Sequence, residues 1–193
     1  YCHIPFCNDV CYYCGCNKIV TRDHARSAEY MKVLLEEADL VGEKLTGTRT
    51  LEQLHWGGGT PTFLTDDEIL FLMGEIQKRF PFEADGEFSI EVDPRSCPPS
   101  KVKTLKQAGF NRMSLGVQDF NPEVQKAVNR IQPLELTRSV IEAAREEGFH
   151  SINMDLIYGL PKQTRESFKR TIEHVIELSP DRIALYHYAH LPN

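Results

Sequence analysis

The sequence has little of what marks a membrane or nucleic-acid-binding protein. No apolar run approaches the ~18 residues that indicate a membrane span. No block of lysine and arginine occurs, and the formal net charge is −6, so neither a nucleic-acid partner nor membrane association is expected. No signal peptide is visible, and the chain starts at Tyr1 without methionine. We expect residues 1–193 to form one core domain of a longer protein, whose C-terminal domain lies outside this chain.

Cysteine is scarce outside one short segment. Five of the six cysteines fall within the first 16 residues, and four of them lie between Cys7 and Cys16. A disulfide framework would spread its cysteines through a small secreted domain. Crowding within a sizeable domain instead favours metal binding in a reducing compartment, so we expect a cytoplasmic protein.

Strand and helix patterns alternate along the chain. Strand patterns cover residues 1–4, 50–56, 87–92, 111–117, 151–159 and 182–188. Helical patterns cover about 27–45, 65–80, 99–108, 121–128, 134–147 and 164–178. In the first helix, one apolar stripe is expected, made of Met31, Leu34, Leu35, Ala38, Val41 and Leu45. Strict alternation predicts an α/β fold with a parallel sheet. Six repeats, the last without its helix, allow an open partial barrel or a doubly wound sheet.

Residues that can bind ligands directly follow the predicted strands. They are the cysteine loop, Gly57 to Pro61, Glu91 with Asp93, Gln118 with Asp119, Asp155 to Pro161, and His187 with His190. In parallel barrels the active site gathers at the carboxyl ends of the strands. We therefore expect all six strand ends to converge on one pocket.

The cysteine loop has the spacing C-x3-C-x2-C over Cys7, Cys11 and Cys14. Iron–sulfur clusters are held by such runs, normally of four cysteines, and three ligands on a four-iron cube leave one iron open. Structural zinc needs four ligands, usually in two pairs. His3 could be a fourth ligand, but no second C-x2-C follows, so the spacing favours iron–sulfur over zinc, with a disulfide third. Cys16 is either a small buried hydrophobe or a pocket thiol that donates hydrogen or orients a ligand.

These motifs resemble those of a known enzyme family. The three-cysteine loop after a first strand, with Tyr13 before its last cysteine, is similar to the radical S-adenosylmethionine (SAM) superfamily. More narrowly, several segments resemble the oxygen-independent coproporphyrinogen III oxidase family: HIPFC, CYYCGCNKIVTR, LHWGGGTPTFL, SIEVDPR, GFNRMSLGVQDFN, VNR, DLIYGLPKQT and YAHLP. The resemblance extends from Tyr1 to Pro192. The cysteine loop specifies only the superfamily, whereas CGCNK and the contexts of Gln118, Arg130 and Asp155 are more specific.

The resemblance implies a (βα)6 three-quarter barrel, the radical SAM core, with a [4Fe–4S] cluster on Cys7, Cys11 and Cys14. It implies two SAM molecules. Matching positions for the first are Tyr1, Tyr13, Gly58 and Glu91, and for the second Gly59, Thr60, Gln118, Arg130, Asp155 and Ala189. A 5′-deoxyadenosyl radical from SAM would start the oxidative decarboxylation of two propionates of coproporphyrinogen III, giving vinyl groups and protoporphyrinogen IX. The partners implied are this tetrapyrrole and an electron donor such as flavodoxin or ferredoxin, with a monomeric enzyme.

The residue chemistry agrees with several of these roles. Aromatic faces such as those of Tyr1 and Tyr13 attract a sulfonium cation. Glycines let backbone groups approach a ligand closely. Strand alternation points Glu91 and Asp155 inward, where a buried carboxylate needs a partner. For Glu91 that partner is a ligand or a neighbouring strand's Arg112.

Other positions are less decisive. Alone, Gln118 and Arg130 favour no role, and Arg130 could be a solvated charge at a helix end. Lys18, Arg22 and Arg112 are candidate contacts for substrate propionates, although for each residue alone a surface charge is the favoured interpretation.

Three other functions stay open. One relative in the superfamily is a haem chaperone, whose cysteine loop ends without a thiol matching Cys16. A haem-degrading radical methyltransferase and a zinc-stabilised structural domain are weaker alternatives. The CGCNK segment favours the oxidase.

Overall fold

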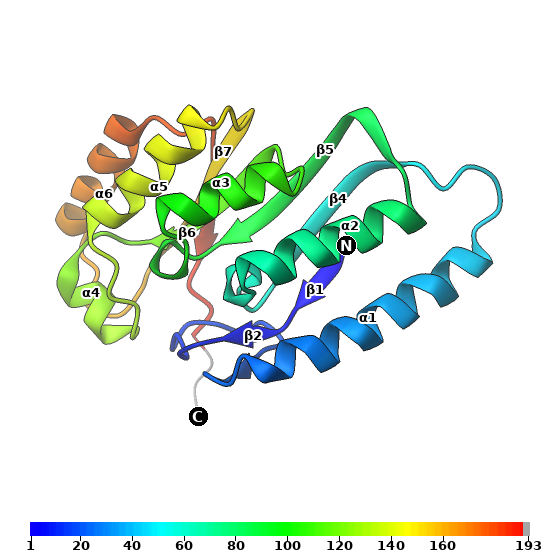
Figure 1. Ribbon diagram of the computed structural model, residues 1–193. Helices are drawn as coiled ribbons and strands as arrows, with labels where there is room; N and C mark the ends of the chain where they lie inside the picture. Colours follow the sequence, from blue (N-terminus) through cyan, green and yellow to red (C-terminus); the bar gives the residue numbers. More distant parts are fainter. Residues whose placement is uncertain (191–193) are drawn as a thin grey trace.

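The main element of the protein is one six-stranded, entirely parallel sheet (Figure 1). The computed structural model describes residues 1–190, so Leu191 and Pro192 of the YAHLP motif lie outside the described residues. In spatial order the strands are β1 (Cys2–Ile4), β4 (Leu51–Gly58), β5 (Phe82–Val92), β6 (Arg112–Gln118), β7 (Ser151–Tyr158) and β8 (Arg182–His187). Spatial order follows chain order, as the alternating pattern predicted.

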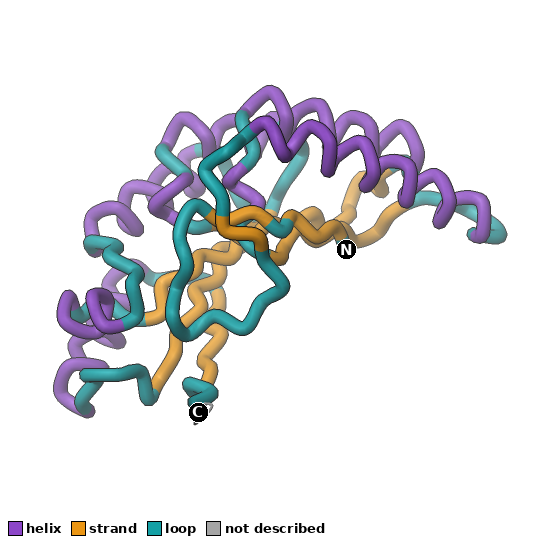
Figure 2. The backbone as a smooth tube through the Cα atoms, turned by 90° about the horizontal axis from the view of Figure 1, so that it is seen from below, coloured by secondary structure: helices purple, strands orange, loops and turns teal. Residues whose placement is uncertain are grey.

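The helices connecting these strands all lie on the convex side of the curved sheet (Figure 2). They are α1 (Ala25–Lys44), α2 (Asp66–Arg79), α3 (Pro99–Gln107), α4 (Pro122–Ala127), α5 (Leu134–Glu146) and α6 (Arg165–Leu178). A doubly wound sheet would carry helices on both faces. The arrangement is therefore the open partial barrel, which decides between the two folds that the sequence left open.

The core lies between the sheet and the helices, and strand alternation explains why. In β5, Phe88, Ile90 and Val92 are buried against the helix layer. The alternate residues Glu87, Ser89 and Glu91 face the concave side, where they form a polar row. Each strand thus supplies apolar side chains to the core and polar side chains to the inside of the barrel.

Local signals set the helix ends where the sequence placed them. Thr65 accepts a hydrogen bond from the backbone N–H of Glu68, whose carboxylate accepts one from the backbone of Thr65, forming the expected capping box. Thr164 and Ser167 cap α6 in the same way. Gly109 and Gly148 directly follow the C-caps of α3 and α5, with φ of 103° and 72°, a left-handed conformation that favours glycine.

Two details differ from the sequence prediction. Val41 and Leu45, expected on the buried stripe of the first helix, are 49% and 46% exposed. They lie at the distal end of α1, which extends past the rest of the helix layer (Figure 1). The sequence also missed a short parallel pair, β2 (Phe6–Cys7) with β3 (Ile19–Val20), because two-residue strands have no detectable alternation.

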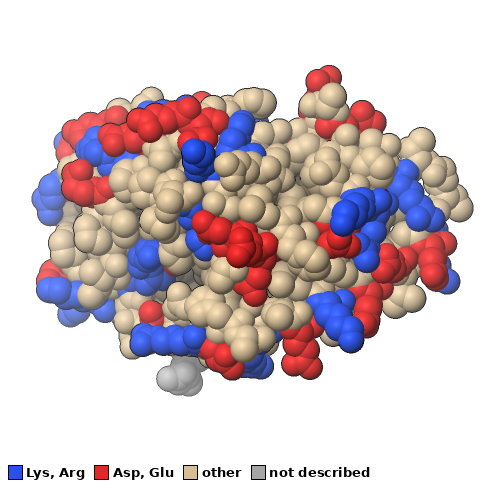
Figure 3. All heavy atoms as spheres, in the orientation of Figure 1, with Lys and Arg blue, Asp and Glu red and all other residues tan. Residues whose placement is uncertain are grey.

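The described surface carries both charge signs interspersed over the face shown in Figure 3, without a large single-sign area on that face. Within residues 1–190, no helix combines the length and the apolar character that crossing a bilayer requires.

Candidate functional site

A cavity of about 570 Å³ opens at the carboxyl ends of the strands. We call it the carboxyl-end cavity. Each strand or the loop after it contributes: Cys7 after β1, Gly58 from β4, Asp93 after β5, Gln118 from β6, Asp155 from β7 and Tyr186 from β8. The predicted convergence of six strand ends is therefore confirmed. His187 and His190 are not among the lining residues, and Tyr186, which the sequence analysis did not single out, takes that place.

The cysteine loop is closed at its base by the missed strand pair. The backbone N–H of Ile19 donates to Pro5 O at 2.7 Å, and that of Thr21 donates to Cys7 O at 2.9 Å. Between these anchors the loop bends back, so that Cys7, Cys11, Cys14 and Cys16 all line the cavity. The Cys7 Sγ lies 3.4 Å from Thr60 Oγ1 on the facing loop.

Two arginines lie beside Cys11. Arg95 Nη2 is 3.5 Å and Arg130 Nη1 is 3.7 Å from the Cys11 Sγ. Both guanidinium groups also bind Asp93, Arg95 through Nη2 at 2.7 Å and Arg130 through Nη1 at 3.1 Å. Burial alone would raise the pKa of Asp93, but the ion pairs with Arg130 and Arg95 outweigh it and hold the pKa below its ordinary value. We call Asp93, Arg95 and Arg130 the ion-pair cluster.

Arg130 is a buried residue rather than a solvated charge at a helix end. Its side chain is only 8% exposed, and its Nη2 donates to Gly116 O at 2.6 Å. A Cβ on Gly116 would come within 2.9 Å of that nitrogen, so the glycine leaves the room that the guanidinium occupies. Arg95 was missed because SIEVDPR gives no signal that its side chain folds back onto the cysteine loop.

Cys14 and Cys16 interact directly. A hydrogen bond from the Cys16 thiol, together with the ammonium group of Lys18, lowers the pKa of Cys14 to about 5. The same contact raises the pKa of Cys16. Lys18 Nζ is fixed by Cys14 O at 2.8 Å. The lowered pKa favours the thiolate form of Cys14, the form that ligates metals, and Cys16 lies at the exposed rim of the cavity.

Gly58 and Gly59 line the cavity directly beside the base of the cysteine loop. Gly58 has φ of 118°, and its N–H donates to Glu91 Oε2 at 3.1 Å. A Cβ on Gly59 would lie 2.6 Å from Pro5 O, so only glycine lets the two loops approach this closely.

Glu91 faces the concave side, as predicted, but its side chain is 44% exposed rather than fully buried. Besides the Gly58 N–H, it contacts His55 Nε2, which lies 3.4 Å from Oε1. The sequence left open an ion pair between Glu91 and Arg112 on the neighbouring strand. This ion pair does not form, because the Arg112 side chain pairs with Glu87 instead.

Asp155 and Gln118 line the same cavity from β7 and β6. Asp155 accepts hydrogen bonds from Ser114 Oγ at 3.0 Å and Asn153 Nδ2 at 2.8 Å, while burial raises its pKa. Gln118 adopts φ of 67° where the β6–β7 register shifts, a strained conformation for a non-glycine residue. Asp119 faces away and binds Thr171 Oγ1 at 2.8 Å, a structural role.

The remaining predicted residues are spread more widely. Tyr13 lines the cavity next to the cysteines. Tyr1 lies on the concave face, 72% exposed, with its ring stacked 5.8 Å from that of His55. Ala189 is exposed beyond β8 and does not line the carboxyl-end cavity. Lys18 lines the cavity, whereas Arg22 pairs with Asp9 at its exposed edge.

Comparison with known protein families identifies the family to which this chain belongs. The profile of the radical SAM superfamily matches residues 1–175. The chain belongs to the radical SAM superfamily. Membership implies a [4Fe–4S] cluster and S-adenosylmethionine, and it agrees with the partial-barrel fold.

Two curated radical SAM relatives cover the whole chain. The chain is 52% identical to the oxygen-independent coproporphyrinogen III oxidases of Pseudomonas aeruginosa, over 194 residues, and of Escherichia coli, over 192 residues. It spans only 42% of the length of each of these relatives.

Similar solved structures agree with the family that the sequence comparison gives. A structure of coproporphyrinogen III oxidase from Escherichia coli, described as a radical SAM enzyme, has a TM-score of 0.95 and 52% identity and covers 100% of this chain and 44% of that one. HydG, a maturase of the [FeFe]-hydrogenase, shares the fold with a TM-score of 0.65 at 16% identity, covering 100% of this chain and 43% of that one.

The cavity fits an iron–sulfur cluster. Cys7, Cys11 and Cys14 line one cavity, Cys14 is poised as a thiolate, and two guanidinium groups direct N–H donors at the Cys11 sulfur. Hydrogen bonds to sulfur tune such clusters. Among residues 1–190, no group of three or more Cys, His, Asp or Glu is close enough to hold a single metal ion.

Proposed function

We propose that the protein carrying this chain is an oxygen-independent coproporphyrinogen III oxidase. It would convert two propionate groups of coproporphyrinogen III to vinyl groups with loss of CO2, giving protoporphyrinogen IX. The observation that carries this proposal is 52% identity over the whole chain to curated enzymes of that name. The cavity residues, including those of the CGCNK segment, fall inside the matched region.

The proposed cofactor set is one [4Fe–4S] cluster and two SAM molecules. Cys7, Cys11 and Cys14 would hold the cluster, which with SAM supplies the one-electron chemistry that begins hydrogen abstraction from a propionate. The first SAM would contact Tyr1, Tyr13, Gly58 and Glu91, and the second Gly59, Thr60, Gln118, Arg130, Asp155 and Ala189. In support, eight of these ten residues line the carboxyl-end cavity, the exceptions being Tyr1 and Ala189.

The charges inside the cavity suit a zwitterionic ligand. Glu91 and Asp155 offer carboxylates to ammonium or ribose groups, and the ion-pair cluster offers guanidinium N–H donors to a carboxylate. Gly58 and Gly59 leave room for backbone contacts. These residues would bind and orient SAM without supplying a proton.

Cys16 is the proposed catalytic residue. Its thiol is exposed at the rim and contacts Cys14, a contact that raises the pKa of Cys16 and so favours the protonated form. It would hold that proton at Sγ, in position to donate hydrogen or orient the substrate. Lys18, fixed beside it, would attract a substrate propionate.

We further propose a reduced flavodoxin or ferredoxin as electron donor, a monomeric enzyme and a cytoplasmic location. The six free cysteines of the chain support a reducing compartment.

The test is an anaerobic assay of the full-length protein with reductant, SAM and coproporphyrinogen III. We expect vinyl product together with 5′-deoxyadenosine. Cys16→Ser should keep its iron and sulfide but lose decarboxylation, whereas Cys2→Ser, a control outside the cavity, should retain both. Haem transfer without turnover would contradict the proposal and favour the chaperone alternative. Full activity of Cys16→Ser would refute the role of that thiol.

A further inference from the structure

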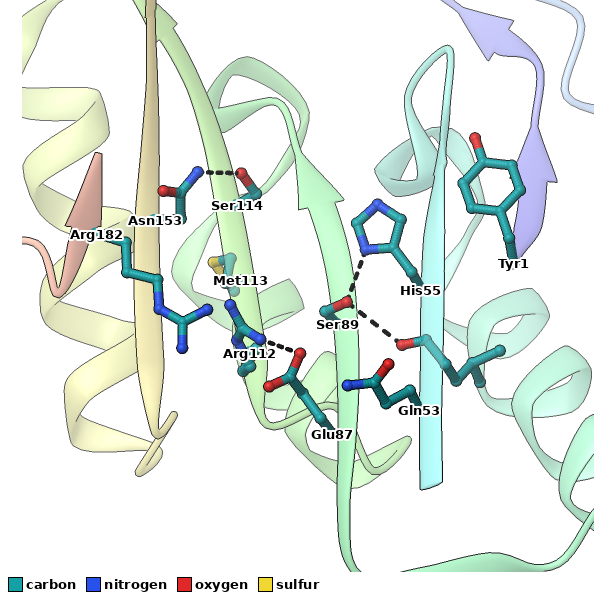
Figure 4. Close-up of a pocket in the computed structure, with 11 residues that line it drawn as sticks. Tyr1, Gln53, His55, Glu87, Ser89, Arg112, Met113, Ser114, Asn153 and Arg182 are labelled. Atoms are coloured by element: carbon teal, nitrogen blue, oxygen red, sulfur yellow. Dashed lines mark hydrogen bonds and ion pairs between the residues drawn. The ribbon is translucent and has the colours of Figure 1, made fainter. Parts of the chain in front are cut away.

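A second cavity lies on the concave face of the sheet, nearer the amino ends of the strands than the carboxyl-end cavity (Figure 4). We call it the amino-end cavity. Its volume is about 540 Å³, similar to that of the carboxyl-end cavity. Six of its lining residues carry a charged, imidazole or amide group and do not line the carboxyl-end cavity: Gln53, His55, Glu87, Arg112, Asn153 and Arg182. The hydroxyl groups of Tyr1, Ser89 and Ser114 complete the polar lining.

The amino-end cavity contains more positive than negative charge. Arg112 and Arg182 extend toward one another across β7, and Glu87 is the one carboxylate among the lining residues (Figure 4). Glu87 pairs with Arg112, whose side chain is 20% exposed. Arg182 makes no ion pair with any residue in the described range 1–190. The cavity therefore holds two guanidinium groups and one carboxylate, and that carboxylate pairs with Arg112 alone.

The hydrogen-bonding capacity has the same bias. Asn153 Nδ2 already donates to Ser114 Oγ and Asp155 Oδ1, each at 2.8 Å. The guanidinium group of Arg182 has five N–H donors in a planar fork, the geometry that matches a carboxylate. Gln53 adds an amide from the opposite wall. Arg182 on one wall and Gln53 on the other thus offer N–H donors that suit an anionic acceptor.

The two cavities adjoin but are lined by different charged residues. Ser114 lines both of them. Glu91 and Asp155 face the carboxyl-end cavity, whereas Arg112 and Arg182 lie further toward the amino ends of their strands. Arg182 is four residues before Tyr186 on β8, which corresponds to about 13 Å along a strand. A ligand on Arg182 would therefore be separate from one held at the strand ends.

We propose that the amino-end cavity binds a carboxylate, held by Arg182 and by the part of Arg112 that Glu87 leaves free. The carboxylate belongs either to a small organic acid or to an acidic side chain from the part of the protein outside this chain. Both sources present the same group to the same two guanidiniums. In either case the ligand relieves the repulsion between two cations inside a concave surface.

The experiment is calorimetric titration of the full-length protein with succinate, with melting temperatures measured in parallel. Arg182→Gln and Arg112→Gln remove the two cations, and Glu87→Gln removes the competing carboxylate. Arg170→Gln, on the exposed face of α6, is the matched control. If a small acid is the ligand, succinate binding saturates, weakens at least tenfold in both arginine variants, and strengthens in Glu87→Gln.

If the protein's own acidic side chain fills the cavity, succinate does not bind, and Arg182→Gln melts several degrees lower than Arg170→Gln. Succinate binding that survives both arginine substitutions overturns the proposal, because the acid then binds elsewhere. Absence of binding together with equal melting temperatures of Arg182→Gln and Arg170→Gln also overturns it. Neither readout depends on cluster loading or turnover, so the result is independent of the proposed function.

Discussion

Asp93→Asn offers the sharpest test of how the cavity is held together. The substitution removes the negative charge that Arg95 and Arg130 share, while leaving the side-chain size almost unchanged. The Asp93 and Arg130 side chains are only 11% and 8% exposed, so water cannot replace the lost carboxylate. Removing one partner of a buried ion pair costs about 3–5 kcal/mol, because an uncompensated charge remains.

We expect the cluster-free protein to lose about 3 kcal/mol of stability, the lower end of that range, since asparagine still accepts one hydrogen bond. For a domain of this size each kcal/mol lowers the melting temperature by about 2–4 °C, so the predicted shift is about 6–12 °C. Circular dichroism of the full-length protein, followed through thermal unfolding, measures it.

Asp39→Asn is the matched control. Asp39 also binds an arginine through two hydrogen bonds, Arg79 Nε at 2.7 Å and Nη2 at 3.1 Å, but its side chain is 56% exposed. Exposed ion pairs contribute about 0–1 kcal/mol, so the shift should stay below about 4 °C. Equal shifts in the two variants would refute the argument that burial makes the ion-pair cluster important.

The pH dependence has a defined sign. The folded-state pKa of Asp93 lies below its ordinary value of about 3.9. A lowered pKa contributes stability that is present above the unfolded value and is lost as pH falls through the folded value. The difference between wild type and Asp93→Asn should therefore be full at neutral pH and shrink below about pH 4.

Further predictions concern single positions. Gly59→Ala should destabilise the protein by about 1–3 kcal/mol in urea unfolding, because its Cβ would meet Pro5 O at 2.6 Å. Gly74→Ala, in α2 with open space around the position, should instead stabilise it by about 0.5–1 kcal/mol; a matching loss would contradict the steric argument. Carboxyl carbon NMR should place the titration midpoint of the Asp155 carboxyl group above the ordinary Asp pKa of about 3.9. The stability that Asp155 contributes is then present at low pH and is lost as pH rises through that midpoint. A midpoint below that ordinary pKa would show that burial does not desolvate this carboxyl group. Glu91→Gln should weaken SAM binding by about tenfold in equilibrium dialysis, the loss of one charge-assisted hydrogen bond, and unchanged affinity would remove Glu91 from the proposed site.

The sequence predicted the parts of the fold that repeat. Alternation along β5 and β7 placed Glu91 and Asp155 on the concave face, and capping residues placed the start of α2. Val41 was misjudged because periodicity identifies the apolar stripe of α1 without showing how far the layer it packs on extends. The two-residue pair β2–β3 is set by the closing of the cysteine loop rather than by its own sequence.

Some features of the candidate site could also be predicted from the sequence, whereas others appear only in the folded chain. The spacing of Cys7, Cys11 and Cys14 is local in the chain and could be interpreted directly. The ion-pair cluster joins Arg95 and Arg130 to Cys11 over 84 and 119 residues of sequence, so only the folded chain shows it. Strand register places Arg112 opposite Ser89, midway between Glu87 and Glu91. The Arg112 side chain turns to Glu87, a choice that composition does not encode.

The most direct test of the account is the metal content and paramagnetic resonance of anaerobically reconstituted full-length protein, with and without SAM. The account predicts one [4Fe–4S] centre whose reduced spectrum changes on adding SAM. Serine at Cys7, Cys11 or Cys14 should abolish the centre, while serine at Cys2 should leave it intact. Bound zinc, or a cluster that survives serine at Cys14 or whose spectrum ignores SAM, would contradict the claim that these three thiols hold a cluster with one open iron.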